Sequence, residues 1–390
     1  MVKPFNFARL PLIYFGAGKI SGLPDIISRF GTTVLIVTGK RSFLETPQAA
    51  LLIKDLKRKG IIQHHVTVAS EPSPALIDDT VNRYRDAGID VVTAIGGGSV
   101  VDAGKAISAM LCMPGSVKDY LEIVGSMEHP GTKVPFIAAP TTSGTGSEAT
   151  KNAVISEVGP DGFKRSLRHD NLVPDIAIVD PELTLNCPAD ITAAAGMDCF
   201  TQLAEGFLSV RSNEYTDALA VEGIKAVHRS LSRAFTDGTD IEARSDMSFA
   251  ALTSGICLAN AGLGAVHGIA GTIGGSFNVP HGVVCGTLMA AANEINIREM
   301  RRAKTENNAM KKYTVLGRII SKTEGREDDF YADSFIDYLH EMTEKLALPC
   351  LGKYGISLSD VPAICSQSDI KNNPVRLTEE NMAEIIERRL

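Results

Sequence analysis

The first half of the chain alternates short apolar runs with longer amphipathic segments. The short runs span residues 33–39, 91–97, 135–141 and 175–180. They are rich in β-branched residues and bounded by Gly or Pro, so they predict buried strands. Segments 45–60 and 74–88 have helical spacing and end in glycine, a common helix terminator. This alternation predicts a parallel sheet with right-handed crossovers.

The pattern changes after Pro188, where β-branched runs become rare and helical spacing dominates. The stretch "PADITAAAGMDCFTQLAEGFLS" (188–209) opens this part. The amphipathic tail "LTEENMAEIIERRL" (377–390) closes it, with a capping box expected at Thr378 and Glu380. No internal repeat or low-complexity linker is visible. We therefore predict a nucleotide-binding α/β domain over residues 1–185 and an all-helical domain over residues 186–390.

Residues 247–293 contain no Asp, Glu, Lys or Arg, which raises the question of a membrane span. A spanning helix needs about 20 predominantly apolar residues. Nine glycines, Pro280, two histidines and three asparagines interrupt this stretch. It therefore predicts buried helices packed closely through small residues.

Composition indicates an ordinary globular protein and argues against a strongly basic binding protein, but it does not identify a function. The 390 residues are 44% hydrophobic and 22% charged, as in an ordinary globular chain, and the net charge is −7. We expect no nucleic-acid or membrane partner, since both attract basic patches. Seven scattered cysteines without a CxxC pair predict buried free thiols in a reducing compartment. The N-terminus lacks the apolar core of a signal peptide, so we expect a cytoplasmic protein.

The segment "VVTAIGGGSVVDAGKAIS" (91–108) reads as a strand, a glycine turn and a helix. Glycines let backbone N–H groups approach an anion, and a helix N-terminus adds unpaired donors and partial positive charge. We expect a pyrophosphate at Gly96, Gly97, Gly98 and Ser99, although the spacing is not GxGxxG and a plain tight turn remains the alternative. A second loop, "APTTSGTGSEATKNAVIS" (139–156), follows another predicted strand. Loops at the carboxyl ends of parallel strands share one crevice, so both should face one nucleotide.

Two histidines fourteen residues apart, His267 and His281, lie inside the uncharged stretch. Each alone could be a hydrogen-bonded core imidazole. Asp198 and Gln202 have the i, i+4 spacing that puts both on one face of the helix over 188–209. Asp198 alone could be a cap or half of a buried ion pair, but burying it against a cation removes the cost of an unpaired charge. Together these residues favour a divalent metal site, with Glu205 a turn further along the same helix.

These segments together resemble the iron-containing (group III) alcohol dehydrogenases over essentially the whole chain. The matching motifs are "YFGAGKI" (14–20), "IGGGSVVDAGKAI" (95–107), "PTTSGTGSEAT" (140–150), "GMDCFTQLAEGF" (196–207), "VHG" (266–268), "PHG" (280–282) and "NNPVRLTEEN" (372–381). The resemblance implies a Rossmann-like α/β domain, a helical domain and an active site in the cleft between them, a plan shared with dehydroquinate synthase.

The resemblance also implies an activity and its residues. The activity is reversible hydride transfer between NAD or NADP and an alcohol or aldehyde. The residues expected to contact the coenzyme are Gly39, Gly97, Gly98, Ser99, Asp102, Thr141, Thr142, Thr145, Lys164 and Leu183. The expected metal ligands are Asp198, Gln202, His267 and His281; of these, Asp198, His267 and His281 are also the expected catalytic residues. The metal, Fe²⁺ with Zn²⁺ as the alternative, would act as a Lewis acid on the substrate oxygen and promote hydride departure.

Two positions depart from the family pattern. The family usually has His at the position of Gln202, so an amide oxygen replaces an imidazole and would bind softer metals less well. The family often has a second His at the position of Gly271, one turn after His267, and that imidazole is missing here. The sequence therefore predicts a modified metal site without a proton relay through position 271.

The choice between NAD and NADP depends on the residues after strand 33–39. Relatives that prefer NAD often have Asp at the position of Gly39, where a carboxylate would repel a 2′-phosphate. Here Gly39 is followed by Lys40 and Arg41, which could attract that phosphate, although the same turn could be merely a solvated basic loop. The pattern favours tolerance of NADP.

The residues are also compatible with different functions on the same fold. A dehydroquinate synthase-like lyase would need basic residues for a phosphorylated acid, and "FKRSLRH" (163–169) could supply some of them. The chain could also be a polyol dehydrogenase, or a nucleotide-binding protein with a decayed metal site. The resemblance further implies a homodimer or larger homo-oligomer. The substrate beyond a small alcohol or aldehyde is not readable from the sequence.

Overall fold

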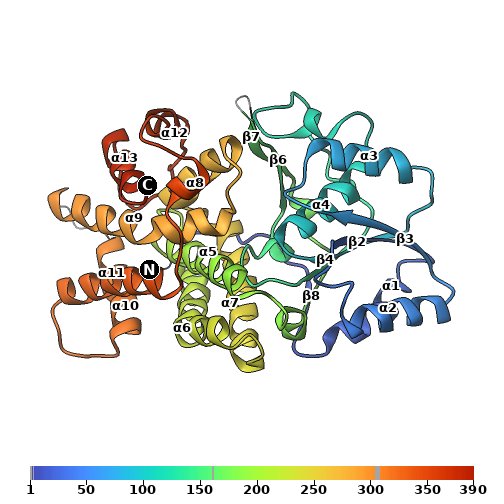
Figure 1. The fold of residues 1–390 in the computed structure, drawn as a ribbon, viewed down its shortest axis with the longest axis horizontal. Coiled ribbons are helices and arrows are strands. Elements are labelled where there is room, and N and C mark those ends of the chain that lie inside the picture. The colour runs from blue at the N-terminus through green and yellow to red at the C-terminus, as the bar shows by residue number, and fades with distance from the viewer. Residues whose placement is uncertain (1, 3, 160–161, 304–307) are drawn as a thin grey trace.

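The chain folds into a sheet region and a helical region that lie side by side along the long axis of the molecule (Figure 1). This computed structural model describes residues 2, 4–159, 162–303 and 308–390. All strands lie between Leu12 and Val179, and the chain from Ala189 to Glu387 contains only helices and their connections within the described residues. The predicted fold class, a Rossmann-like α/β part followed by a helical part, is confirmed.

Six parallel strands form the main sheet in the order β1-β8-β5-β4-β2-β3. Their bounds are β1 Leu12–Phe15, β2 Thr33–Gly39, β3 Ile62–Val68, β4 Val91–Gly96, β5 Phe136–Pro140 and β8 Ile176–Val179. All four predicted strands are present as β2, β4, β5 and β8, in the middle of the sheet. Their continuous apolar runs reflect burial on both faces, as expected for interior strands of a parallel sheet.

Helices cover both faces of this sheet. Along β2, Leu35 and Val37 face one side while Val34 and Ile36 face the other, the two-residue period of a strand. The first pair packs on α3 (Pro74–Tyr84) and α4 (Gly98–Met110), and the second on α1 (Leu23–Ile27) and α2 (Pro47–Arg58). Figure 1 shows α3 and α4 on one side of the sheet and α1 and α2 on the other.

Four strands were not predicted from the apolar pattern. Two of them lie at the edges of the main sheet, and the other two contain charged residues. β1 and β3 are the two edge strands of the sheet, and all residues of β3 ("IQHHVTV") except the last are exposed or only partly buried. Edge strands need no continuous apolar run because one side faces water or loops. β6 (Asn152–Glu157) and β7 (Phe163–Arg168) form a separate antiparallel hairpin. The prediction of a loop for all of 139–156 was therefore wrong at its end, and the basic stretch after Gly162 is a strand.

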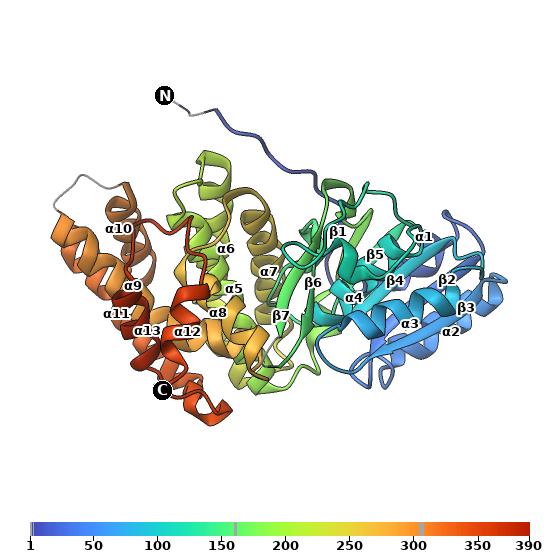
Figure 2. The same cartoon turned by 90° about the horizontal axis from the view of Figure 1, so that it is seen from above.

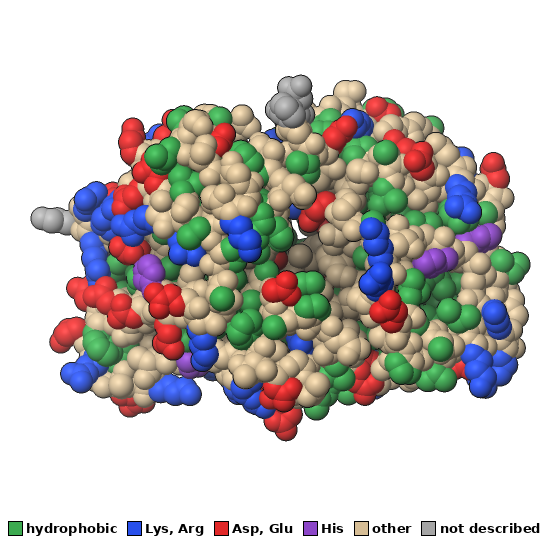
Figure 3. All heavy atoms as spheres, viewed as in Figure 1, with side chains coloured by type: hydrophobic (Ala, Val, Ile, Leu, Met, Phe, Trp, Pro, Cys, Tyr) green, Lys and Arg blue, Asp and Glu red, His purple; other side chains and the backbone are tan. Residues whose placement is uncertain are grey.

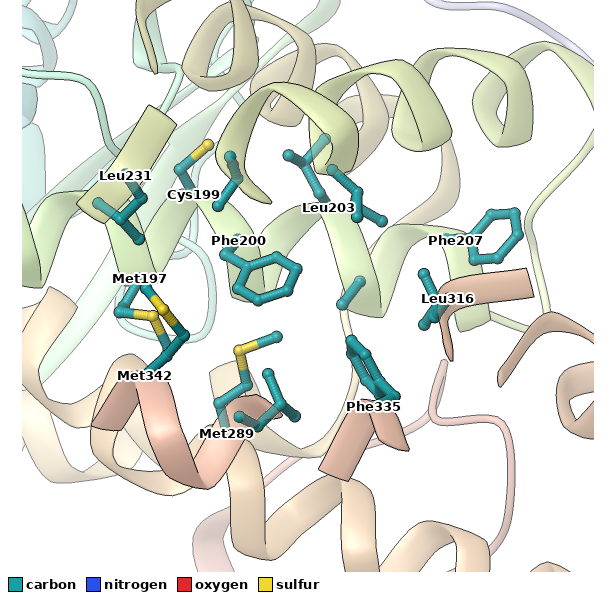
Figure 4. Packing of buried hydrophobic residues seen from close by; sticks show 14 of the residues in the cluster. Met197, Cys199, Phe200, Leu203, Phe207, Leu231, Met289, Leu316, Phe335 and Met342 are labelled. Carbon is teal, nitrogen blue, oxygen red and sulfur yellow. The ribbon is translucent and has the colours of Figure 1, made fainter. Parts of the chain in front are cut away.

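Helix α5 (Ala189–Leu208) runs through the centre of the helical region, with three-quarters of its residues buried. The other helices are α6 Glu214–Thr236, α7 Ile241–Ala261, α8 Ala265–Ser276, α9 His281–Ala303, α10 Asn308–Ser321, α11 Asp328–Lys345, α12 Val361–Gln367 and α13 Glu379–Glu387. Figure 4 shows Phe200 and Leu203 of α5 pointing among side chains of the surrounding helices, and the Phe200 ring meets Phe335 edge-on at 6.1 Å between centroids. Thr378 caps α13 as predicted, but Asn381 rather than Glu380 completes the box.

The N-terminal segment crosses onto the helical region before the sheet begins (Figure 2). The rings of Phe5 and Phe7 lie 5.2 and 5.9 Å from the ring of Tyr215, measured between centroids. The backbone N–H of Ala8 donates to Asn260 Oδ1 at 2.6 Å. The domain boundary predicted at 185/186 falls between β8 and α5 and stays a prediction. The N-terminal residues belong to the predicted first domain but pack on helices of the second.

The uncharged stretch spans most of α7, all of α8 and the first half of α9, and its side chains are mostly buried. Among the described residues, no single helix is long and apolar enough to cross a bilayer. Helices α7 and α8 pass that test only as a pair, and they meet at 97°.

All seven cysteines are free, as predicted. The expectation that all are buried was wrong for Cys112 and Cys350, which are exposed, and for Cys187, which is only partly buried.

Candidate active site in the cleft

A cavity of about 940 Å³ lies between the carboxyl ends of the sheet strands and helices α5, α8 and α9. Its size is typical of a site for a coenzyme or a small ligand. Residues of both regions line it, among them Gly97 of the sheet region and His267 of the helical region. Figure 3 shows the surface hollowed between the two halves of the molecule. The two predicted binding features therefore open into a single space.

The glycine turn lies where β4 ends and α4 begins. Gly97 is the extended N-cap residue and Gly98 the first residue of the helix. A Cβ on Gly98 would lie 2.8 Å from the side chain of Thr145, and one on Gly96 would lie 2.5 Å from Val100. Packing therefore requires glycine at both positions, and the N-terminal backbone donors of α4 reach the cavity beside Ser99.

The second polar loop lies next to the glycine turn and touches the helical region. The N–H of Thr141 donates to the carbonyl of Gly96 at 2.9 Å, which joins the two loops. Gly146 has φ of 61°, and a Cβ there would lie 2.4 Å from the carbonyl oxygen of Ala251 on α7. Thr142 and Thr145 line the cavity, whereas Thr141 is buried beneath it. This loop thus supplies hydroxyls to the cleft and is itself held in place by its close packing on α7.

The structure places the remaining coenzyme candidates in two groups. Asp102 and Lys164 line the same cavity as the glycine turn. Gly39 and Leu183 are not among its lining residues. Gly39 ends β2 beside the carboxyl end of β4, and Leu183 packs in the apolar cluster on the α1 and α2 side of the sheet. Their contacts with a coenzyme remain predictions.

A buried lysine that the sequence pattern did not reveal supports the second loop. Lys105 on α4 is fully buried, and its Nζ donates to the carbonyls of Ser147 at 2.9 Å and Asn152 at 2.7 Å. Asp102 accepts from the backbone of Val154 at 3.1 Å and from the hydroxyl of Ser147. Burial lowers the pKa of Lys105 to about 8. The i, i+3 pair Asp102 and Lys105 within an apolar helix is the signal that could have identified this support.

The predicted metal ligands come together from three helices. Nε2 of His267 on α8 lies 3.2 Å from Oδ1 of Asp198 on α5, and Nε2 of His281 at the start of α9 lies 3.9 Å from the same oxygen. Burial alone would raise the pKa of Asp198, but the hydrogen bond from His267 and the nearby His281 lower it. Burial and the charge of Lys164 lower the pKa of His281 to about 4, which keeps this imidazole in the neutral, metal-binding form.

Gln202 completes the predicted set and contains an unsatisfied polar atom. Its side chain is buried, and its Nε2 donates to the carbonyl of Gly144 at 3.4 Å. Its Oε1 is buried and has no hydrogen-bond partner among the described residues. Leaving a buried acceptor unsatisfied costs about 1–3 kcal/mol, and a cation bound beside Asp198 would remove that cost. The donors present therefore fit a divalent metal.

Two residues close to this cluster were not predicted as part of it. Glu205 Oε2 lies 2.7 Å from Nδ1 of His267, and its Oε1 accepts from the N–H of Val266 at 2.7 Å. A carboxylate bonded in this way fixes the tautomer and orientation of an imidazole, as outer-shell partners do at metal sites. Cys285 also lies beside the cluster: its ligand atom and those of Asp198, His267 and His281 all lie within 4.8 Å of one another. Glu205 is seven residues after Asp198 on α5, and Cys285 is four residues after His281 on α9. Both spacings put the two residues on the same face of their helix, which is the signal that could have identified them.

Gly271 leaves open space in the cleft. It lines the cavity, and a Cβ placed on it would meet no atom within 4 Å. Lys164 on β7 also lines the cavity and pairs with Glu71 at 3.1 Å. The cleft wall above the metal cluster is thus glycine on α8 and a lysine–glutamate pair from the sheet region.

The chain is similar to known proteins over its whole length. The family model "Iron-containing alcohol dehydrogenase" matches residues 11–181, and the model of the C-terminal part of the Fe-containing alcohol dehydrogenase family matches residues 192–390. A long-chain-alcohol dehydrogenase of Geobacillus thermodenitrificans is 35% identical over 273 residues, which cover 70% of this chain and 68% of that protein. An NAD-dependent methanol dehydrogenase of Bacillus methanolicus is 29% identical, covering 99% of this chain and all of that protein.

Solved structures show the same similarity. A 1,3-propanediol oxidoreductase has a TM-score of 0.89 at 26% identity and covers both chains completely. A sulfoacetaldehyde reductase from Bifidobacterium kashiwanohense, solved with NAD⁺, has a TM-score of 0.85 at 26% identity, covering 99% of both chains.

The two family models together span nearly the entire chain, which confirms the family predicted from its motifs. The predicted class of enzyme, an NAD(P)-dependent alcohol dehydrogenase, agrees with the relatives that match over the full length. The chain therefore belongs to the iron-containing alcohol dehydrogenase family and is a metal-dependent oxidoreductase that transfers hydride between a nicotinamide coenzyme and an alcohol or aldehyde.

Proposed function

We propose that the reaction takes place in the cleft between the glycine turn and the Asp198–His267–His281 cluster, and that the substrate is a small alcohol or aldehyde. The observation that carries this proposal is that the N-terminus of α4 and the cluster of Asp198, Gln202, His267 and His281 open into one cavity of about 940 Å³. Hydride transfer needs a nicotinamide ring and the substrate carbon held together away from bulk water. A single cleft with the coenzyme turn at one end and the proposed metal ligands at the other could hold the nicotinamide ring against the substrate.

For the coenzyme, the N–H groups of Gly97, Gly98 and Ser99 at the start of α4 would hold the pyrophosphate. Asp102, Thr142, Thr145 and Lys164 line the cavity beyond that turn and would contact the rest of the dinucleotide. We retain Gly39, Thr141 and Leu183 as weaker candidates. Gly39 ends a strand at the edge where ligands of such sheets bind, and Thr141 is bonded directly to the glycine turn.

For the metal, the proposed ligands are Asp198, Gln202, His267 and His281, all of which line the cavity. A divalent ion bound by these groups would supply Lewis acidity at the substrate oxygen. Glu205 holds Nδ1 of His267, so with an ion bound the lone pair of Nε2 would be free to point toward that ion. Fe²⁺ is the ion expected from the family, and Zn²⁺ is the alternative.

For the coenzyme preference, we propose tolerance of NADP. Gly39 places no carboxylate at the end of β2, and Arg41 is largely exposed and only loosely paired with Glu45 at 3.9 Å. Comparing kcat/KM for NADPH and NADH tests this point, and a strong preference for NADH would contradict it.

A homodimer or larger homo-oligomer and a cytoplasmic location are further proposals. The first rests on family membership and is tested by light scattering of the purified protein in solution. The second rests on seven free cysteines, which a reducing compartment would preserve.

The experiment that tests the proposed function measures NADH and NADPH oxidation with a panel of short aldehydes, before and after chelation of the metal. We expect activity that disappears on chelation and returns when Fe²⁺ or Zn²⁺ is added. Full activity in protein shown to be metal-free would contradict the metal-dependent part of the proposal.

A further inference from the structure

Cys285 lies close enough to the predicted metal ligands to bind the same ion. It is one helical turn after His281 on α9, and the i, i+4 spacing puts both side chains on one face of the helix. Its Sγ is 3.6 Å from Nε2 of His281. In a tetrahedral site with bonds of about 2.0–2.3 Å, two ligand atoms are separated by roughly 3.6 Å. The thiol therefore has the separation from His281 that two ligands of one ion would have.

The thiol is buried next to the cluster and does not line the cavity. Asp198, Gln202, His267 and His281 do line it. With four protein ligands, the substrate oxygen would have to bind as a fifth ligand from the cavity side, an expansion that catalytic metal sites allow.

Charge gives a second reason to involve the thiol. Helices α8 and α9 contribute no Asp, Glu, Lys or Arg before Glu294, so Asp198 and the outer Glu205 are the nearby carboxylates on α5. Asp198 is the only charged group among the proposed direct ligands, so a thiolate at Cys285 would supply a second negative charge in direct contact with a divalent ion. The neutral amide of Gln202 cannot supply that charge.

We propose that Cys285 is a ligand of the metal and takes the place of the imidazole that is missing at position 202. The set would be Asp198, His267, His281 and Cys285, again four protein ligands, with Gln202 nearby as a weak oxygen donor. Because thiolate is a soft ligand, this set would favour Zn²⁺ over Fe²⁺. The inference rests on the proposed metal site in the cleft.

The competing interpretation is that Cys285 only fills space. Its neighbours on α9, Val284 and Leu288, belong to a buried apolar cluster that includes Cys285, and free cysteine often behaves as a small apolar residue. In that case the thiol would not change its electronic state when a metal is bound, which a spectrum can detect.

The test loads the metal-free protein with Co²⁺ and records its absorption spectrum. We expect a thiolate-to-cobalt charge-transfer band in the near ultraviolet for the wild-type protein, absent in C285S. The matched control is C257S, since Cys257 is equally buried in α7 but bonds to the carbonyl of Thr216, away from the cluster, and the band should be unchanged. Q202L should also retain the band.

Zinc affinity gives a second readout. Removal of an outer-shell partner lowers metal affinity by roughly 10–100-fold, and the zinc affinity of C285S should fall by more than this. The loss of affinity for Fe²⁺ should be smaller than the loss for Zn²⁺. Circular dichroism of C285S checks that the variant is folded.

The outcomes separate this inference from the proposed function. Cobalt bound without a charge-transfer band in the wild-type protein overturns the role of Cys285 and leaves the metal site in place. No cobalt bound at all overturns both. A band that C285S retains would assign the thiolate to another cysteine and would also overturn the inference.

Discussion

At the sheet end of the cleft, the groups that face the cavity include the backbone donors of one short turn, Gly97 to Ser99, and neighbouring side chains such as Thr142 and Thr145. At the helical end, they are side chains from α5, α8 and α9, spread from Asp198 to His281. The turn depends on the absence of side chains, because a Cβ on Gly98 would meet Thr145. The metal cluster depends on particular side chains held by helix packing. The two ends should therefore respond to mutation in different ways.

The largest effect is expected at the helical end, from Asp198→Asn. Loss of the carboxylate should remove the metal, which contributes several kcal/mol to the transition state, so kcat should fall by about 10²–10⁴-fold. Metal analysis and aldehyde reduction rates check this together. Asp190→Asn is the matched control, since Asp190 is on the same helix and lines the same cavity outside the cluster. Equal losses in both variants would contradict the assignment.

The next effect is expected from Glu205→Gln, which keeps an oxygen for the N–H of Val266 but removes the charge beside His267. Loss of an outer-shell carboxylate typically lowers metal affinity or activity about 10–100-fold. Metal titration and kcat should both report it, with the melting temperature nearly unchanged. A variant that binds metal as tightly as the wild-type protein would show that Glu205 only anchors α8.

At the sheet end, Gly98→Ala should act on coenzyme binding. The new Cβ would approach Thr145 to 2.8 Å, and overpacking of this kind costs about 1–3 kcal/mol. We expect KM for the coenzyme to rise by about tenfold, since 1.4 kcal/mol corresponds to that factor. Metal content should be unchanged. Gly22→Ala, where a Cβ meets nothing within 4 Å, is the control, and an unchanged KM in Gly98→Ala would argue against the turn as the coenzyme site.

The smallest effect compares two glycines of α8 that both line the cavity. A Cβ on Gly268 would lie 2.4 Å from the carbonyl oxygen of Asp369, whereas one on Gly271 meets nothing. Gly268→Ala should therefore destabilise the protein by about 1–3 kcal/mol. Gly271→Ala should be neutral or stabilise it by about 0.5–1 kcal/mol, because Ala is the better helix former. Denaturant unfolding of both variants measures the difference; equal losses would show that position 271 is not open.

The two ends also differ in how far the sequence predicted them. The glycine turn is continuous in sequence and lies between a strand and a helix, so its place at the sheet edge could be predicted from local pattern. The interior strands were predicted for the same reason, while β1, β3 and the β6–β7 hairpin lacked a continuous apolar run.

The metal cluster needed packing information that spacing alone does not contain. The i, i+4 pair Asp198 and Gln202 was visible, and the two histidines were visible as candidates. That Glu205 reaches His267 depends on how α8 crosses α5, and that Cys285 points into the cluster depends on where α9 begins. Lys105 was missed because its partners are carbonyls of a distant loop.

A metal held by Asp198, His267 and His281 should lie in the same cleft as the coenzyme. Anomalous diffraction at the absorption edge of the bound metal, from crystals grown with coenzyme, tests it most directly. We expect one strong peak within bonding distance of all three side chains, with the coenzyme's pyrophosphate at the Gly97–Ser99 turn. A peak elsewhere, or fully active crystals with no peak at this cluster, would contradict it.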